Sequence, residues 1–350
     1  MSKNLFVGVD GKARKAKEFY VGVNGKARRI VKAYIGDENG KARPFWEKES
    51  HLGENSLEFV SDDNFSMSAT KLWNGTIEYN NGNGWITWNG SQILSGKING
   101  RQRIYFRGSR NTVIRGQNAT RENSWKILWS NVECNGNIEC LLDYQKVAAG
   151  EHPEMGIGCY KFLFYNCSTL ITAPQLLATT LVEDCYYYMF SETSITTAPQ
   201  LPATTLARGC YLAMFQKCSS LTTAPQLPAA TLVKSCYYGM FNDCSSLSQV
   251  NLPMCEYIGN YTFRNCYSLS QISLPVCKYI TDYAFWFCSS LSIMTIGYSS
   301  ICSLKNSNAF SKTQITSSTG SIYVPTSLVD SYKSANYWSY FSTQIFPISE

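Results

Sequence analysis

Charged and histidine side chains are scarce in this sequence, and their scarcity excludes several kinds of chemistry. Charged residues make up 16% of the 350 residues, and His51 and His152 are the two histidines. A Ser–His–Asp triad or a multi-histidine metal site is therefore not expected. Glycine-rich phosphate loops and G-x-S-x-G nucleophile motifs are also missing. We therefore expect no enzyme, and neither catalytic residues nor a cofactor or metal.

Long apolar runs are missing as well. No stretch of about 18 apolar residues occurs, so we expect no insertion into a membrane. The opening MSKNLFVGVDGKARK has neither the apolar core nor the small-residue cleavage site of a signal peptide. If the natural chain starts here, we expect it not to use the general secretory route.

Residues 1–46 contain three copies of one short segment, FVGVDGKARK, YVGVNGKARR and YIGDENGKARPFW. Each copy centres on Asp-Gly or Asn-Gly, which favour two-residue hairpin turns. We predict a β-meander of three hairpins. Gly8 then lies opposite Ala13, and Gly22 opposite Ala27, so that a strip of small residues lets another surface approach closely. We expect this block to serve in anchoring and assembly.

The same block is strongly basic. It holds seven lysines and four arginines against two aspartates and two glutamates, a net charge of +7 in a chain of +6. Such a segment could contact nucleic acid or an acidic protein surface, or it could be the solvated face of the hairpins. We expect a protein partner and no nucleic acid.

Residues 55–150 consist of short aromatic and β-branched segments, such as TIEYNNGNGWITWNG and RQRIYFRG, separated by glycine and asparagine turns. This pattern predicts an all-β, sandwich-like domain. We expect Trp85, Trp88 and Tyr105 to lie in its core or to be half-buried. Asp62 and Asp63 are adjacent, so a strand would point them to opposite faces instead of pairing them for acid–base chemistry.

Residues 156–321 repeat one pattern, first at intervals of 25 or 26 residues and later at 22. A fixed period of this length, with leucine at fixed offsets, predicts a leucine-rich-repeat solenoid in which neighbouring coils must stack. The fold class is thus mainly β. Side chains at equal offsets should form ladders: Leu221, Leu247, Leu269 and Leu291; Val250, Ile272 and Met294; Phe215, Phe241, Phe263 and Phe285.

The segment 322–350 departs from the repeat. It offers a strand followed by a short helix, with Ser327 as the expected N-cap residue. We predict that it forms the polar C-terminal cap that a stack of repeats requires.

Fourteen cysteines raise the alternatives of disulfides and buried thiols. Cys159, Cys210 and Cys236 are each followed by a second cysteine eight residues later, but Cys185 is followed at that distance by Thr193. Because this repeat lacks the second cysteine and keeps the rest of the pattern, we favour reduced thiols that are buried like apolar side chains.

The alternating segments SQVNLP and SQISLP suggest a binding face. If Val250, Leu252, Ile272 and Leu274 point to the core, the residues between them point to solvent on the concave side. Their amides and hydroxyls, with tyrosines nearby, could hydrogen-bond a glycan or peptide, or they could simply be solvated. The candidate ligand-binding residues are Gln249, Asn251, Gln271, Ser273, Tyr257 and Tyr279.

The repeats, in the forms CSSLTTAPQLPAATL and LPxCxxIxxxAFxxC, and the ending IYVPTSLVDSYK resemble the BspA-like leucine-rich-repeat family of bacterial and phage surface proteins. This resemblance covers about residues 156–345 and implies adhesion without catalysis. The VGVxGKAR segments of residues 1–46 resemble the start of tail-associated proteins in phages of gut bacteria.

Together the two resemblances imply a non-enzymatic phage tail fibre or receptor-binding protein. Residues 1–46 would dock on other tail or baseplate proteins, and the repeats would bind a host-surface glycan or protein. The protein would be assembled in the host cytoplasm and located in the virion tail, as a homotrimer by analogy with other fibres. The alternative is a BspA-like adhesin or interaction module on a bacterial cell surface.

Overall fold

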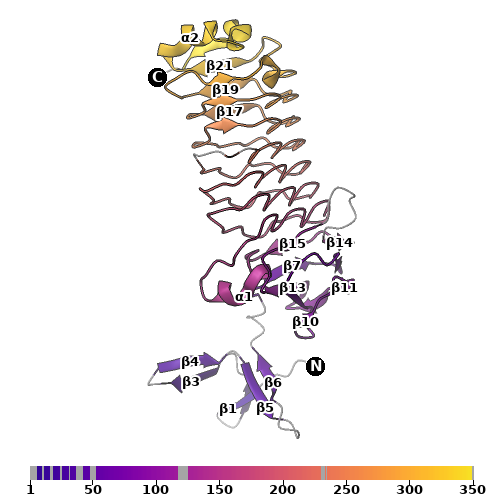
Figure 1. The fold of residues 1–350 in the computed structure, drawn as a ribbon. Coiled ribbons are helices and arrows are strands. Elements are labelled where there is room, and N and C mark those ends of the chain that lie inside the picture. The colour runs from indigo at the N-terminus through magenta and orange to yellow at the C-terminus, as the bar shows by residue number, and fades with distance from the viewer. Residues whose placement is uncertain are drawn as a thin grey trace. The chain divides into compact units, whose positions relative to one another are not determined.

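The computed structural model consists of two compact units, residues 1–54 and 55–350. It describes residues 53–116, 125–229, 233 and 235–348 in full, and the backbone of six strands before residue 48. About 24% of the chain is strand and 10% is helix, so the fold is mainly β, as predicted (Figure 1). Among the described residues, none of the helices has the length and apolar character needed to span a bilayer.

The first unit contains three antiparallel strand pairs. Gly8 lies opposite Ala13 and Gly22 opposite Ala27, which confirms the predicted register. Each pair forms its own two-stranded sheet, so the described strands do not make the continuous meander that the repeat predicted. The Asp-Gly and Asn-Gly turns lie outside the described residues. The pairs are β1 (Phe6–Val9) with β2 (Lys12–Lys15), β3 (Phe19–Val23) with β4 (Lys26–Ile30), and β5 (Lys32–Gly36) with β6 (Ala42–Glu47).

The second unit begins with two antiparallel sheets. The larger has the order β10-β9-β13-β7-β15, with β12 also paired to β13, and the smaller has the order β11-β8-β14. Helix α1 (Cys140–Ala148) packs against β13. The strands are β7 (Leu57–Ser61), β8 (Ser66–Ser68), β9 (Thr76–Asn80), β10 (Ile86–Thr87), β11 (Ile93–Leu94), β12 (Gly96–Ile98), β13 (Arg101–Ser109), β14 (Lys126–Leu128) and β15 (Glu133–Asn135).

Aromatic side chains fill the core of these sheets. The ring centroids of Phe106 and Trp125 are 4.9 Å apart, and those of Trp88 and Trp125 are 5.1 Å apart. Trp88 and Tyr105 are buried, as predicted. Trp85 is half-buried.

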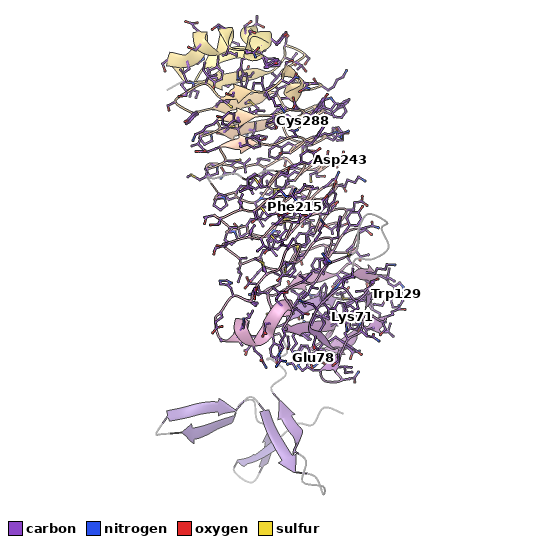
Figure 2. The ribbon with its side chains drawn as sticks, viewed as in Figure 1. Lys71, Glu78, Trp129, Phe215, Asp243 and Cys288 are labelled. Atoms are coloured by element: carbon purple, nitrogen blue, oxygen red, sulfur yellow. The ribbon has the colours of Figure 1, made fainter. Side chains whose placement is uncertain are left out.

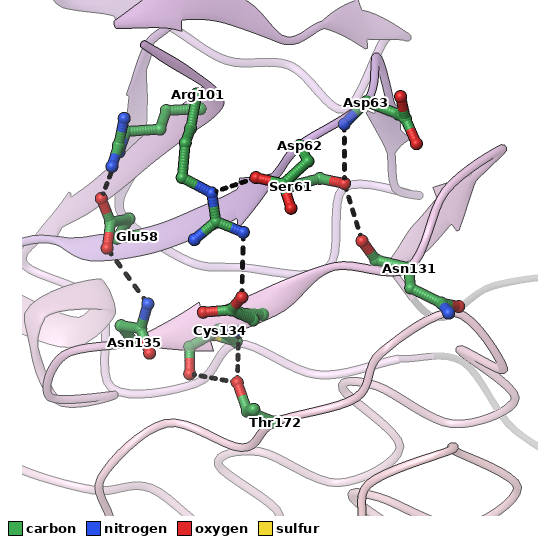
Figure 3. Close-up of polar contacts among 11 residues, drawn as sticks. Glu58, Ser61, Asp62, Asp63, Arg101, Asn131, Cys134, Asn135 and Thr172 are labelled. Carbon is green, nitrogen blue, oxygen red and sulfur yellow. Dashed lines mark hydrogen bonds and ion pairs between the residues drawn. The ribbon is translucent and has the colours of Figure 1, made fainter. Parts of the chain in front are cut away.

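Polar contacts join the strands of the larger sheet to one another and to the first repeat (Figure 3). The Arg101 guanidinium bridges Asp62 at 2.7 Å and Glu133 at 3.0 Å. The Thr172 hydroxyl accepts a hydrogen bond from the Cys134 amide at 2.9 Å and donates one to the Cys134 carbonyl at 3.3 Å. The block predicted at 55–150 and the first of the repeats predicted at 156–321 are therefore in direct contact.

Each repeat after residue 156 is one coil, bonded through its backbone to the next coil (Figure 1). The Phe164 amide donates to the Met189 carbonyl at 3.0 Å, and the Phe190 amide donates to the Met214 carbonyl at 3.0 Å. The same bond recurs at the phenylalanine of each following coil up to Phe285. The coils therefore satisfy their backbone groups by stacking.

A ladder of phenylalanine rings runs through the interior of the stack, with Phe215 in its middle (Figure 2). Neighbouring rings lie 5.4–5.8 Å apart and within 15° of parallel. This confirms the predicted phenylalanine ladder, which also includes rings that the prediction did not name. Its members are Phe164, Phe190, Phe215, Phe241, Phe263, Phe285 and Phe310.

Aromatic residues close the ladder at both ends. Phe164 contacts Trp125 of the central sheets with a centroid distance of 6.1 Å. At the other end, Phe310 contacts Trp338 at 5.8 Å and Phe341 at 5.5 Å. One hydrophobic core thus continues from the sheets, through the coils, into the C-terminal segment.

The other predicted ladders are mostly buried too. Ile272 and Met294 are buried, as are the four leucines, whereas Val250 is only half-buried and packs at the edge of the core. Val250 also lines the groove described below. The fully buried leucines are Leu221, Leu247, Leu269 and Leu291.

All 14 cysteines are buried as free thiols. The Cys218 thiol donates to the Phe190 carbonyl of the preceding coil at 3.0 Å, and the Cys244 thiol donates to the Phe215 carbonyl at 3.0 Å. At the equivalent place in its own coil, the Thr193 hydroxyl donates to the Phe190 carbonyl at 2.8 Å. A thiol at this position thus bonds to the preceding coil, whereas the threonine hydroxyl bonds within its own coil.

Two sets of short parallel strands lie along the later coils. One has the order β16-β18-β20 and the other β17-β19-β21-β22. Their bounds are β16 (Tyr257–Ile258), β17 (Gln271–Leu274), β18 (Tyr279–Ile280), β19 (Ile293–Ile296), β20 (Ser303–Leu304), β21 (Ser321–Val324) and β22 (Ile345–Pro347).

The C-terminal segment is fastened to the last coils by two buried hydrogen bonds. The Trp338 indole donates to the Cys302 carbonyl at 2.6 Å, and the Tyr332 hydroxyl accepts from the Cys302 amide at 2.7 Å. The prediction of Ser327 as N-cap is wrong. A 3-10 turn that includes Ser327 precedes the helix, and the N-cap residue of the helix is Leu328. The helical elements are η2 (Ser307–Phe310), η3 (Thr326–Leu328), α2 (Val329–Ser334) and η4 (Trp338–Gln344).

Candidate ligand-binding groove

The parallel sheet β17-β19-β21-β22 has one buried face and one exposed face. In β17, Ile272 and Leu274 are buried while Gln271 and Ser273 are exposed. In β19, Met294 and Ile296 are buried in the same alternation. This follows from the period of two along a strand, which sends alternate side chains to the core and to solvent.

Parallel pairing aligns the exposed side chains of successive coils in two columns. In the first column, Gln271 lies beside Ile293, and Ile293 beside Ser321. In the second column, Asn251 lies beside Ser273, and Ser273 beside Thr295. Residues far apart in the sequence thereby form continuous rows on one face.

These rows line a shallow groove with a volume of about 410 Å³. Four of the six candidate ligand-binding residues, Gln249, Asn251, Gln271 and Ser273, lie together in it. The lining is rich in amides, hydroxyls and aliphatic groups and includes no charged side chain. Its members are Thr223, Ser248, Gln249, Val250, Asn251, Gln271, Ile272, Ser273, Ile293 and Thr295.

The two candidate tyrosines lie elsewhere. Tyr257 is on β16 and Tyr279 on β18, in the other parallel sheet, and neither lines the groove. Their ring centroids are 6.5 Å apart, and Tyr279 is 53% exposed. The sequence grouped them with the groove because they follow its strands closely, but each coil turns a corner between the two sheets.

Sequence reasoning missed some members of the groove. Ile293 and Thr295 stand 22 residues after Gln271 and Ser273, which is the period of these coils. That period was the signal that could have found them. Thr223 was harder to predict, because it belongs to a longer coil, where its hydroxyl donates to the Gln249 amide oxygen at 3.4 Å.

The remaining polar groups suggest no other chemistry. The His152 ring contacts the buried Glu139 carboxylate at 2.9 Å, and His51 lies outside the described residues. Within the described ranges, no three histidine, cysteine, aspartate or glutamate side chains are grouped so that they could hold a metal ion. Burial raises the pKa of Cys167, Cys210 and Cys218 to about 12, which keeps these thiols protonated and poorly nucleophilic near neutral pH.

Comparison with known proteins supplies the family. The BspA type leucine-rich-repeat region matches in six copies, over residues 156–253 and 209–333, which together span just over half of the chain. The protein belongs to the BspA-type leucine-rich-repeat family. Members of this family are typically bacterial surface proteins that act as non-enzymatic binding or adhesion modules, and no catalytic family is indicated.

No curated protein matches the chain. Among solved structures, the chain is similar to a leucine-rich repeat protein from Bacteroides ovatus ATCC 8483, with 19% sequence identity and a TM-score of 0.33. The match covers 56% of this chain and 65% of that protein.

Proposed function

We propose that this BspA-type protein is a bacterial surface adhesin or interaction module that binds its ligand in the groove. The groove itself carries the proposal, because coils distant in sequence combine there into aligned rows of amides and hydroxyls. An aligned polar face on a stack of hydrogen-bonded coils is a preorganised surface, and preorganisation lowers the entropic cost of binding.

We further propose that residues 156–321 act as a leucine-rich-repeat solenoid, with residues 55–150 covering its first coil and residues 322–350 forming its cap. The contacts of Phe164 and Phe310 with aromatic residues at the two ends support this division. Without such covers, the terminal coils would expose their phenylalanine rings to water.

A substitution in the middle of the groove tests the binding site. Ser273→Arg should block the groove, whereas Ser268→Arg places the same side chain at an exposed position of another segment of the coil. Fluorescently labelled full-length protein is measured for binding to cultured epithelial cells and to Bacteroides ovatus cells. We expect Ser273→Arg to weaken binding at least about tenfold on the cells that bind, and Ser268→Arg to leave it unchanged. Equal binding by both variants, or binding to neither cell type, would contradict the proposal.

A second candidate function is a phage tail fibre or receptor-binding protein. The paired glycine and alanine positions of the basic hairpins favour it, since small residues allow close packing on a partner. Residues 1–46 would then dock on tail or baseplate proteins, and Gly8, Ala13, Gly22 and Ala27 would face the partner or other copies in a homotrimer.

The mass of the full-length protein in solution tests this second function. A trimer should dissociate towards monomer when Gly8→Leu and Gly22→Leu are combined, because the larger side chains prevent close approach. Light scattering gives the mass, and a monomeric unaltered protein would remove the support for a trimeric fibre. Binding to the epithelial cells would favour the adhesin over the fibre, since a phage receptor lies on the bacterium.

A further inference from the structure

The exposed face of the groove continues beyond its polar rows onto two aromatic rings. Thr295 lies beside Tyr323 on β21, and Tyr323 lies beside Phe346 on β22. The Tyr323 and Phe346 ring centroids are 6.2 Å apart, with 40° between the ring planes. The column that begins with Asn251 therefore ends in an aromatic pair.

These two rings face outward because of the strand alternation. Ile322, Val324 and Ile345 are buried on the core side, so Tyr323 and Phe346 must project on the opposite side. Phe346 is 41% exposed. Since folding buries large aromatic side chains by preference, an exposed ring in line with a groove is an informative feature.

The extended face carries no charge among its described residues. The ten residues that line the groove are uncharged, and so are Ser321, Tyr323 and Phe346. By contrast, Lys278 pairs with Glu256 at 2.6 Å and Lys305 with Asp282 at 3.0 Å on the parts of the coils that carry β18 and β20. An anionic ligand on the uncharged face would lose hydration without gaining an ionic partner.

The spacing of the polar rows also limits the ligand. Parallel strands lie about 4.8 Å apart, so the amides and hydroxyls repeat at about this interval across the coils. This interval is comparable with the length of one pyranose unit in an extended polysaccharide. Each sugar unit that crosses a strand can therefore meet a new donor or acceptor, and the apolar face of a terminal sugar can stack on an aromatic ring.

We propose that this face binds a neutral oligosaccharide that runs across the strands and places one sugar ring on Tyr323 and Phe346. The proposal rests on the binding function proposed for the groove and specifies its ligand class. Gln271 and Ser273 supply hydrogen bonds, and the aromatic pair supplies the apolar platform at one end.

The test uses full-length protein on a printed array of oligosaccharides. The neutral members contain hexoses and N-acetylhexosamines, and the acidic members carry sialic acid, sulfate or uronic acid. We expect binding to neutral members, weakened about two- to tenfold by Phe346→Ala or by Tyr323→Ala, as loss of one stacking contact implies. Tyr340→Ala is the matched control, because Tyr340 is a 73% exposed aromatic residue of η4 that lies outside this face. Urea unfolding of each variant shows whether it remains folded.

Any result other than the expected one contradicts a stated part of the proposal. Binding to acidic members alone would overturn the neutral ligand, and neutral binding that neither aromatic substitution weakens would overturn the platform. If no oligosaccharide binds while Ser273→Arg still abolishes binding to cells, the ligand class is wrong and the adhesive function stands. If binding to cells is also absent, both proposals fail.

Discussion

The longer coils and the shorter coils of this protein share one core and differ in their strand face. From Phe190 to Phe215 the chain takes 25 residues, and from Phe263 to Phe285 it takes 22. The two ring pairs are nevertheless 5.8 Å and 5.4 Å apart. The three extra residues of a longer coil therefore lie in a part of the coil that does not alter the phenylalanine ladder.

The longer coils differ from the shorter coils in their proline content on the strand face. The longer coils contain TAPQLPATTL or close variants, with Pro199 and Pro202 in one copy, and the described residues 156–229 include isolated bridges such as Thr197 with Thr223 but no strand. Proline has no amide hydrogen to donate to a ladder. Two shorter coils carry SQISLP and SIMTIG there, which form β17 and β19, whereas the preceding SQVNLP contributes only isolated bridges such as Asn251 with Ser273. The core thus specifies the stack, while the strand face varies and forms the groove.

The buried thiols give the largest expected effect, because both kinds of coil contain them. Burial raises the pKa of Cys210 and Cys218 in the longer coils, and of Cys255 in a shorter coil, to about 12. Unfolded thiols titrate near their ordinary pKa of 9.0. Stability should therefore be complete below pH 9 and be lost as the pH rises towards 12. Each such thiol lowers the free energy of unfolding by about 1.4 kcal/mol per pH unit in this window.

Urea unfolding under reducing conditions, followed by circular dichroism from about pH 8 to about pH 11, measures this loss. Cys218→Ser is the control, because a serine hydroxyl does not titrate in this range. The slope of the free energy of unfolding against pH should then lose the contribution of one thiol. Two separate alkaline unfolding transitions would contradict a shared core, since they would show that the longer and shorter coils do not unfold together.

The phenylalanine ladder gives the next largest effect. Phe215 and Phe263 are fully buried, one in each kind of coil, and each ring lies between two others. We expect Phe215→Ala and Phe263→Ala each to lower the free energy of unfolding by about 3–5 kcal/mol, because each leaves a cavity in a continuous stack. Urea titration measures both losses.

Tyr267→Ala provides the comparison for an exposed aromatic residue. Tyr267 is 45% exposed, and its removal should change stability by about 0.5 kcal/mol or less. Clearly unequal losses for the two phenylalanine variants would mean that coil length alters the packing of the core.

The repeat period predicted the parts of the fold that recur. A side chain at a fixed offset must meet its equivalent in the next coil, so the phenylalanine and leucine ladders followed from spacing alone. The contact of Phe164 with Trp125 did not, because it joins a repeat to a segment that has no period. The sharp turns before the thiols were also hidden, since Lys217 and Phe287 adopt φ values of 58° and 60° without the glycine that usually signals such turns.

The repeat period also predicted those parts of the groove that recur from coil to coil, and it missed the parts that do not. Gln271 and Ser273 were found from alternation, and the 22-residue period leads from them to Ile293 and Thr295. Tyr323 could not be reached in this way. It stands 28 residues after Thr295, because the coil between them carries η2 and a longer turn.

A proline placed in a shorter coil tests the difference between the two kinds of coil most directly. Its expected effect on the free energy of unfolding is smaller than those of the thiols and the phenylalanines. Thr295 lies in β19, which is paired on both sides with β17 and β21. Thr295→Pro should lower the free energy of unfolding by about 1–3 kcal/mol, because it leaves a ladder carbonyl without its donor. Thr295→Ala keeps the amide and separates this loss from that of the side chain.

The reciprocal change belongs in a longer coil. Pro199→Ala restores an amide hydrogen where the described structure has only isolated bridges, so its effect should stay within about 1 kcal/mol, set by the flexibility of the unfolded chain. Urea titration compares the two variants directly. If proline is tolerated equally at both positions, ladder hydrogen bonds are not what distinguishes the coils, and the missing strands of the longer coils need another cause. If Thr295→Pro alone is costly, the prolines account for the position of the groove along the stack.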